Sequence, residues 1–247
     1  MQTAAEPISD KFGRAWRRLR GRPEPHQALK EAEHYFKNFN QNKNLTEYEF
    51  VVMDTELTGL SARQDEIVSI GAIKIRNFMI TADSFYSLVA PKIDIPKTST
   101  LIHRITADQV KNAPRLREVL PRFLKFCGNA LIVGHNIGMD MQFLNRAAPD
   151  ILGGKLKTPC LDTMRLAQMY EAEQWENYYD RYDASVSYQL GDLSKKYGLP
   201  DFGQHNSLYD AMQTAYLFLF LVKKLHSGDI RTLKDLYLAG RSWRWYM

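Results

Sequence analysis

Two acidic residues stand at the end of a short apolar run early in the chain. Residues 50–60 read FVVMDTELTGL, in which the apolar run FVVM precedes Asp54 and Glu56. Such a run is typical of a buried strand, and side chains two positions apart on a strand project from the same face, about 7 Å apart. Paired carboxylates in that arrangement can hold a divalent cation. The alternative is a strand that runs into a polar turn at Gly59.

Two further polar clusters stand where helices are expected to begin. The segment HNIGMD ends at Asp140, and Asp162 is followed by Thr163 at the start of another helical pattern. An acid in the first turn of a helix is favoured by the helix dipole, and short polar side chains cap helix N-termini. Helix capping therefore explains each cluster when it is taken alone, and it is the preferred interpretation for Asp162.

A third cluster, HNSLYD, places His205 five residues before Asp210. Ser207 and Asp210 have the spacing of a capping box, which would occupy both side chains with backbone amides. An imidazole titrates near neutral pH and can take a proton from a water molecule, so His205 is a candidate general base. Capping a helix and binding a metal are compatible roles for Asp210.

Composition and charge favour an intracellular protein with an anionic partner. The 247 residues carry a net charge of +5, which points to nucleic acid first. Cys127 and Cys160 lack metal-binding spacing and predict reduced thiols in a cytoplasmic protein. The most apolar run, 215–222, is far shorter than the roughly 20 residues that span a bilayer, and the N-terminus lacks an apolar secretion signal. We expect no membrane partner.

The expected secondary structure is that of an α/β domain. Strands come first, followed by helices that alternate with short strands, which predicts a mixed central sheet flanked by helices. The first three strands are expected to form an antiparallel meander, and a loop that contains His103 is expected after Pro91. The predicted strands are 50–53, 66–76, 84–89 and 130–134, and the predicted helices are 28–39, 116–126, 141–147, 163–171, 189–197 and 207–226.

The chain divides into three parts by composition. Residues 1–46 form a basic extension with one amphipathic helix, residues 47–227 form the main domain, and residues 228–247 form a basic, aromatic tail. The extension is either a solvated tail or an arm along a phosphate backbone. The tail can dock on the domain, pair two subunits or touch nucleic acid. The aromatic and acidic segment 175–188 is either a base-stacking surface or a flap for a partner.

The spacing of the acids and the histidine resembles that of the DEDDh, or DnaQ-like, exonucleases. The residues that carry the resemblance are Asp54, Glu56, Asp140, His205 and Asp210. DTELTGL is similar to the family's first motif, LIHRIT to a loop usually read as HGIT, and LDTMRLA to the segment after the second acidic helix. The similarity covers about residues 48–224 and is nearest in character to the proofreading exonucleases of bacterial replicative polymerases. The resemblance implies that residues 47–227 have a ribonuclease H-like fold. It also implies that this domain removes nucleotides from a 3′ end.

The same resemblance implies phosphodiester hydrolysis with two divalent cations. Two ions about 3.5 to 4 Å apart can stabilise both the attacking and the departing oxygen. Hard oxygen ligands suit Mg²⁺ or Mn²⁺. The implied metal ligands are Asp54, Glu56, Asp140 and Asp210. Asp54 would bridge the two ions and His205 would act as the base, with nucleoside 5′-monophosphates as products.

Substrate contacts are also implied by the resemblance. The residues concerned are Thr58, Gly59, Leu60, His103 and Asn136. The turn from Thr58 to Leu60 would receive the terminal nucleotide, with Leu60 against its base. The alternative is that these residues only form the turn and pack against the domain. The chain departs from the family pattern at Leu57, Arg104 and Met139, where many members have Thr, Gly, and Phe or Ala. These changes bear on the shape of the substrate pocket rather than on the chemistry.

Two other functions use parts of the same pattern. An exoribonuclease would employ the same residues, and the discriminator is whether the pocket accepts a 2′-hydroxyl. A nucleic-acid-binding or polymerase-associated module without catalysis belongs to a different class, and the presence of all five chemical positions argues against it. The leading hypothesis is a metal-dependent 3′–5′ exonuclease that prefers single-stranded DNA. The sequence shows no recognisable polymerase-binding peptide and leaves self-association open.

Overall fold

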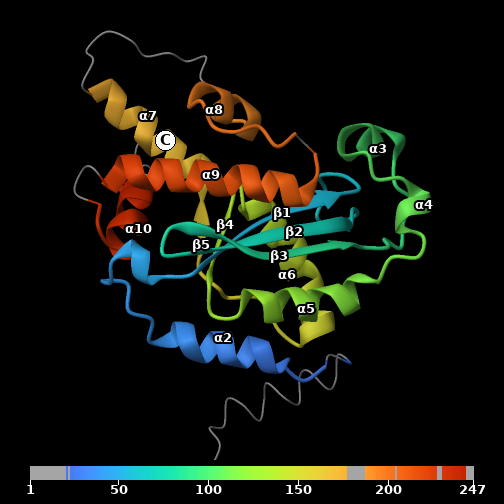
Figure 1. Ribbon diagram of the computed structural model, residues 1–247. Coiled ribbons are helices and arrows are strands. Elements are labelled where there is room, and N and C mark those ends of the chain that lie inside the picture. The colour runs from blue at the N-terminus through green and yellow to red at the C-terminus, as the bar shows by residue number, and fades with distance from the viewer. Residues whose placement is uncertain (1–20, 22, 177–186, 204, 227–229, 243–247) are drawn as a thin grey trace, which may run out of the picture.

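The computed structural model describes residues 21, 23–176, 187–203, 205–226 and 230–242. Its strands are β1 (Phe50–Leu57), β2 (Ile67–Arg76), β3 (Met79–Leu88), β4 (Leu131–Gly134) and β5 (Cys160–Asp162). They form one sheet in the order β3-β2-β1-β4-β5, with helices on both faces (Figure 1). The pairs β1–β2 and β2–β3 are antiparallel, and β1–β4 and β4–β5 are parallel. The predicted mixed sheet is confirmed.

Two layers of helices enclose the sheet. One face carries α2 (Gln27–Lys37), α5 (Leu116–Cys127) and α6 (Gly138–Leu152), and the other carries α7 (Thr163–Glu176), α9 (Ser207–His226) and α10 (Leu233–Ser242). The shorter elements are the 3₁₀ turn η1 (Leu45–Glu47), α3 (Lys97–His103), α4 (Ala107–Val110) and α8 (Leu190–Lys196). The helix α8 packs on α9, and α3 and α4 stand at one end of the sheet.

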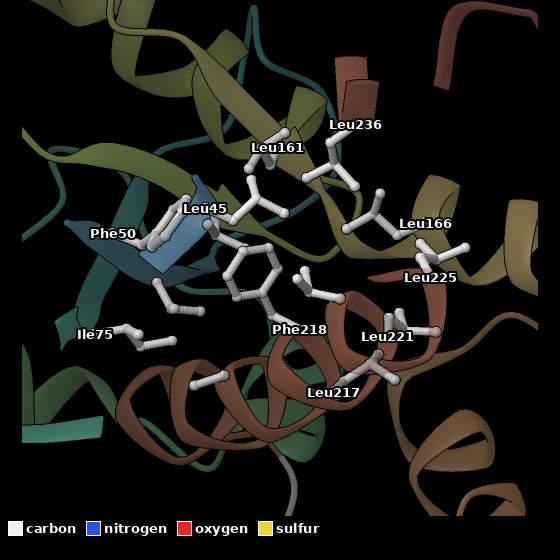
Figure 2. Close-up of a cluster of buried hydrophobic side chains, with 14 of the residues drawn as sticks. Leu45, Phe50, Ile75, Leu161, Leu166, Leu217, Phe218, Leu221, Leu225 and Leu236 are labelled. Atoms are coloured by element: carbon white, nitrogen blue, oxygen red, sulfur yellow. The ribbon is translucent and has the colours of Figure 1, made fainter. Parts of the chain in front are cut away.

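The residues of β1 alternate between the two halves of the core. Phe50 and Val52 belong to the cluster under α9, and Val51 and Met53 belong to the cluster under α5 and α6. Figure 2 shows Phe218 of α9 pointing into the first cluster, where its ring lies 5.0 Å from that of Phe50. A strand that is buried on both faces needs apolar residues throughout, which explains the uninterrupted FVVM run.

The hairpin between β2 and β3 turns through Asn77 and Phe78, whose φ angles are 51° and 54°. Two left-handed residues are what a type I′ turn requires, but Phe is unusual in that position. The sequence pattern therefore does not reveal the turn, and it predicts the third strand from Ser84. The structure corrects this, since β3 begins at Met79.

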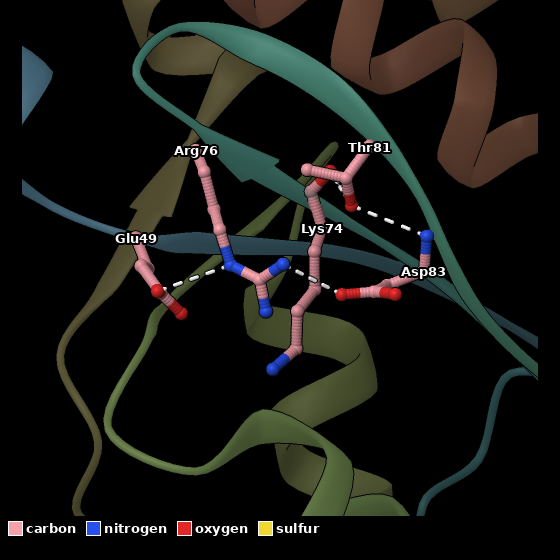
Figure 3. Close-up of polar contacts among 5 residues, drawn as sticks. All are labelled: Glu49, Lys74, Arg76, Thr81 and Asp83. Atoms are coloured by element: carbon pink, nitrogen blue, oxygen red, sulfur yellow. Dashed lines mark hydrogen bonds and ion pairs between the residues drawn. The ribbon is translucent and has the colours of Figure 1, made fainter.

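Arg76 joins the end of this hairpin to the residue before β1, as Figure 3 shows. Its Nε lies 3.0 Å from Glu49 Oε1, and its Nη1 lies 2.7 Å from Asp83 Oδ2. Thr81 accepts a hydrogen bond from the Asp83 backbone and donates one to the carbonyl of Lys74. The ion-paired side chains are close to solvent, so these pairs contribute little to the stability of the hairpin.

The segment after Pro91, expected as a loop, contains the two short helices α3 and α4. A capping box between Thr106 and Gln109 starts α4, and Arg104, at a left-handed φ of 59°, ends α3. Helices of this length lack the repeated apolar spacing from which a helix is predicted, so the sequence pattern does not show them. The expected loop is wrong, and His103 is a buried helical residue.

The described parts of the predicted extension and tail both pack on the domain. Leu29 of α2 is buried against the α5 and α6 side, and Leu233 and Leu236 of α10 are buried with α9. The basic residues before Gly21, with Arg22, and the aromatic residues of 177–186 and 243–247 lie outside the described residues. In the described ranges, no helix combines the length and the apolar character needed to cross a membrane.

The N-terminus of α9 rests directly on β2 at Gly71. A Cβ atom at this position would lie 2.2 Å from the nitrogen of Leu208 and 2.2 Å from the carbonyl carbon of Ser207. The Ser207 hydroxyl is fully buried, 2.8 Å from that of Ser69. Residue 71 must therefore be glycine for α9 to approach this closely, and this approach sets the position of the first turn of α9.

We expect Gly71→Ala to lower the free energy of unfolding by about 1 to 3 kcal/mol, because a methyl group would force α9 away from the sheet. Gly138→Ala is the matched control, since a Cβ there meets nothing within 4 Å. Its effect should stay within about 0.5 kcal/mol. Urea unfolding followed by circular dichroism measures both changes. Equal unfolding midpoints for the two variants would contradict the close contact.

Candidate active site

Three carboxylates meet where β1 ends beneath α9. Asp54 and Glu56 continue the face of β1 on which Phe50 and Val52 face α9, and Asp210 comes from the first turn of α9. One oxygen from each of the three acids lies within 4.8 Å of the others, and in the part of the chain that is described these acids form a group able to hold a metal ion. The strand pairing of acids at i and i+2 therefore does bring them to one face.

Burial raises the pKa of each acid in this group, and repulsion from neighbouring acids raises the pKa values of Asp54 and Glu56 further. Burial, with the charges of Asp210 and Asp140, raises the pKa of Glu56 to about 7. Burial, with the charges of Asp140, Asp210 and Glu56, raises the pKa of Asp54 well above its usual value. Burial also raises the pKa of Asp210, although hydrogen bonding to the backbone of His205 opposes the change. Like charges so close together resist ionisation unless a cation lies between them.

The free oxygen of Glu56 supports a metal at this position. Glu56 is 9% exposed, and its Oε1 is buried without a hydrogen-bond partner among the described residues. A buried acceptor that lacks a donor is costly, and a divalent cation would satisfy it. Because the group supplies oxygen atoms alone, it fits a hard ion such as Mg²⁺ or Mn²⁺.

Asp140 lies beside the three acids but is held differently. It sits in the first turn of α6, is 6% exposed, and its Oδ1 accepts a hydrogen bond of 2.6 Å from the hydroxyl of Thr55. Burial raises the pKa of Asp140 to about 6. The charge of Asp140 raises the pKa values of Asp54 and Glu56, yet its carboxylate is not one of the three that form the group. Sequence reasoning missed Thr55, whose only signal is its position between the paired acids.

His205 stands at the rim of the site, immediately before α9. Its side chain is exposed, its φ is 66°, and its backbone N–H donates to Asp210 Oδ2 at 2.9 Å. Asp210 thus reaches back to the chain before its helix. The cap itself is Asn206, whose Oδ1 accepts from the nitrogens of Leu208 and Tyr209 at 3.1 and 3.3 Å.

The predicted capping box between Ser207 and Asp210 is therefore wrong. The Ser207 hydroxyl is paired with Ser69 instead of the backbone of α9. Close packing of α9 on β2 decides this, because it removes the Ser207 side chain from the helix end.

Asp162 has the capping role that its position predicts. Its Oδ1 accepts from the nitrogen of Met164 at 3.0 Å and from the nitrogen of Asn136 at 2.9 Å. The second bond fixes Asn136 at a left-handed φ of 57°, between β4 and α6. Both ring nitrogens of the neighbouring His135 are engaged, one with Thr163 Oγ1 at 2.9 Å and one with the carbonyl of Tyr188 at 2.8 Å.

The turn after β1 is held by side-chain hydrogen bonds and presents an exposed apolar side chain. Thr58 is buried, and its hydroxyl donates to Asp65 Oδ1 and accepts from the nitrogen of Glu66. A Cβ atom at Gly59 would lie 2.5 Å from the Asp65 carboxylate, so the turn is tightly closed. Leu60 is 79% exposed at its tip. Sequence reasoning missed Asp65, which no motif distinguishes from other surface acids.

His103 reaches the same turn from α3. It is 4% exposed, its Nδ1 accepts from the nitrogen of Ile105 at 3.0 Å, and its Nε2 has no hydrogen-bond partner within the described ranges. Burial lowers the pKa of His103, and the nearby His205 lowers it further. Ser99 Oγ donates to the carbonyl of Thr58 at 2.6 Å, which fastens α3 to the turn.

Comparison with known proteins assigns the family. The family model RNase_T, described as an exonuclease, matches residues 51–218. The chain is 30% identical to the DNA polymerase III subunit epsilon of Aquifex aeolicus (strain VF5) over 204 residues, which are 81% of this chain and 95% of that protein. It is 34% identical to the DNA polymerase III PolC-type of Clostridium perfringens (strain 13 / Type A) over 196 residues, but spans only 13% of that much longer relative.

Two solved structures share the fold. Exonuclease X in complex with 5′ overhanging duplex DNA superposes with a TM-score of 0.56 at 24% identity, over 76% of this chain and 99% of that chain. E. coli exonuclease I in complex with a dA16 oligonucleotide superposes with a TM-score of 0.63 at 15% identity, over 73% of this chain and 42% of that chain.

The matched range contains all five residues that carry the resemblance to the DnaQ-like exonucleases. The structure brings three of their carboxylates together and sets the fourth acid and the histidine beside them. The chain therefore belongs to the exonuclease family, as a domain of the DnaQ and epsilon type with a ribonuclease H-like fold.

Proposed function

We propose that this protein is a metal-dependent 3′–5′ exonuclease that acts on single-stranded DNA and releases nucleoside 5′-monophosphates. The observation that carries the proposal is the cluster of Asp54, Glu56 and Asp210, whose raised pKa values and unsatisfied oxygen call for a cation. The names of the relatives, DNA polymerase III epsilon and PolC, and the DNA bound in the structural neighbours, support DNA as the substrate.

In the proposed reaction, His205 accepts the proton of the attacking water. The water oxygen forms a bond to phosphorus, the bond to the 3′ oxygen of the preceding nucleotide breaks, and that oxygen leaves with the shortened strand. Asp54, Glu56, Asp210 and Asp140 are the proposed ligands of two divalent ions, Mg²⁺ or Mn²⁺. When bound, such ions stabilise the negative charge on the attacking and departing oxygens.

The turn from Thr58 to Leu60 is proposed to hold the terminal nucleotide. Leu60 offers an exposed apolar surface for its base, while the buried Thr58 and the close approach of Gly59 to Asp65 keep the backbone in place. His103 supports the turn through α3 and is the second proposed contact. Asn136, at its left-handed bend, is the third.

We expect wild-type protein with Mg²⁺ or Mn²⁺ to shorten a 5′-labelled single-stranded DNA oligonucleotide stepwise. Asp54→Asn should lower the rate by at least about 100-fold, because it removes a charge from the ion site. Glu49→Gln, which changes an acid at the distant Arg76 pair, is the matched control. Denaturing gels measure the rate of shortening. DNA and RNA strands are compared for substrate preference, and 5′- and 3′-labelled strands are compared for the direction of cleavage. Equal inertness of wild type and Asp54→Asn would reject the enzyme, and shortening of RNA alone would reject the DNA assignment.

We expect His205→Asn to lower kcat by about 10² to 10⁴, the usual contribution of a general base. Asn tolerates the left-handed φ of this position, so the backbone bond to Asp210 should survive the change. An unchanged melting temperature would verify that point. A kcat within threefold of wild type would remove His205 from the proposed chemistry.

The raised pKa values predict how stability depends on pH and metal. An acid whose pKa is higher in the folded state stabilises the fold at low pH, and this contribution is lost as the pH rises through about 7 for Glu56. We expect metal-free protein to melt at a lower temperature at pH 8 than at pH 5.5, and Glu56→Gln to narrow that difference. Mn²⁺ should raise the melting temperature of wild type at pH 8 more than that of Glu56→Gln. Equal responses of the two proteins would place the ion elsewhere.

A further inference from the structure

A cavity of about 230 Å³ lies between α8 and α9 and reaches the acids from the side of His205. Asp54, His205 and Asp210 line its catalytic end, and Ser194 and Gln213 are also among its lining residues. The residues of the substrate turn, Thr58 to Leu60, do not line it, and neither does His103. The cavity therefore has lining residues that the proposed nucleotide contacts do not include, and it shares Asp54, Asp210 and His205 with the proposed catalytic group.

Two buried polar side chains in this cavity have hydrogen-bonding capacity that the protein does not use. Ser194 is 5% exposed and Gln213 is 4% exposed. Gln213 Oε1 accepts from the nitrogen of Phe202 at 3.4 Å, while its Nε2 and the hydroxyl of Ser194 have no partner in the described part of the chain. Buried groups of this kind are satisfied by ordered water when the space is polar and large enough.

The position of Gln213 links these groups to the catalytic end. Residues three apart on a helix share one face, so Gln213 stands one turn further along α9 on the face that presents Asp210. The cavity has room for several water molecules, each of which occupies about 30 Å³ in the liquid. A chain of waters can thus run from Ser194 and Gln213 to the exposed imidazole of His205.

We propose that this cavity is the chamber that delivers and orients the attacking water, with Gln213 and Ser194 as positioning residues. The inference rests on the proposed function. A water held by Gln213 Nε2 or Ser194 Oγ orients the next one, which gives its proton to His205 as its oxygen bonds to phosphorus and the 3′ oxygen departs. In this proposal the end of the strand lies at the turn that carries Leu60, whose residues do not line the cavity.

The test uses competition between water and methanol as nucleophiles on a single-stranded DNA oligonucleotide. Methanol forms the bond to phosphorus in place of water, loses its proton to the same base, and gives a nucleoside 5′-methyl phosphate instead of the 5′-monophosphate. Mass spectrometry of the released products gives the ratio of the two. Polar groups that hold water in the chamber disfavour methanol, so their removal should raise this ratio.

The variants are Gln213→Met and Ser194→Ala, each measured separately in the full chain. We expect kcat to fall about tenfold, the loss of roughly one hydrogen bond in the transition state, with KM within twofold of wild type. The ratio of methyl ester to monophosphate should rise about threefold or more, because the free energy of one hydrogen bond to the water is lost. Thr214→Val is the matched control, because Thr214 also has a buried, unpartnered hydroxyl within the described ranges but does not line the cavity.

The outcomes separate this inference from the proposed function. An inert wild type would reject both. An active wild type whose product ratio is unmoved in both variants would reject the water chamber alone, and so would an equal shift in Thr214→Val. A raised KM with unchanged kcat and ratio would make Gln213 a nucleotide contact and overturn the proposal. If Gln213→Met fails to fold by circular dichroism, Ser194→Ala decides the question.

Discussion

The contact of α9 with β2 is the constraint on which the site depends. The first turn of the helix lies so close to Gly71 that a single methyl group would collide with the backbone of Ser207 and Leu208. This contact carries Asp210 to the end of β1, where Asp54 and Glu56 project. Apolar packing along the rest of the helix, such as Phe218 against Phe50, holds the helix in that place. Precise approach of two backbones thus creates a site from residues more than 150 positions apart.

The same arrangement places mutually repelling carboxylates close together in the candidate active site. Burial raises the pKa values of Asp54, Glu56, Asp140 and Asp210, and neighbouring acids raise those of Asp54 and Glu56 further, which means that folding opposes the ionisation of these acids. The strand that carries two of them begins with four apolar residues, 50–53, that are buried on both faces, so the core offsets the unfavourable charges. A cation would relieve the repulsion, and this couples ion binding to the stability of the fold.

The polar residues around the acids mostly hold the backbone. Three of the non-glycine residues at positive φ are Arg104, Asn136 and His205, and each lies in a segment that ends or begins a helix. Such conformations are unfavourable for residues other than glycine, and hydrogen bonds that the backbone N–H groups of Asn136 and His205 donate to Asp162 and Asp210 maintain two of them. The carboxylates of these two acids thus hold the backbone in place as well as adding negative charge near the site.

Local pattern was enough to predict part of this protein. The apolar run before Asp54, the i and i+2 spacing of the first two acids, the long helix 207–226 and the mixed sheet follow from periodicities that neighbouring residues create. The short helices α3 and α4 and the Asn77–Phe78 turn escaped prediction, because their stability comes from caps and packing instead of from a repeated apolar pattern.

The sequence by itself determined which residue types and spacings were available, and hence the family resemblance. Only the tertiary structure decided that Asp54, Glu56 and Asp210 share one space, that Asp140 turns towards Thr55, and that Asn206 rather than Ser207 caps α9. It also placed Ser194 and Gln213, which belong to no motif, in the cavity beside the acids. These facts depend on how closely separate elements pack, and packing distance is not encoded in the spacing of residues along the chain.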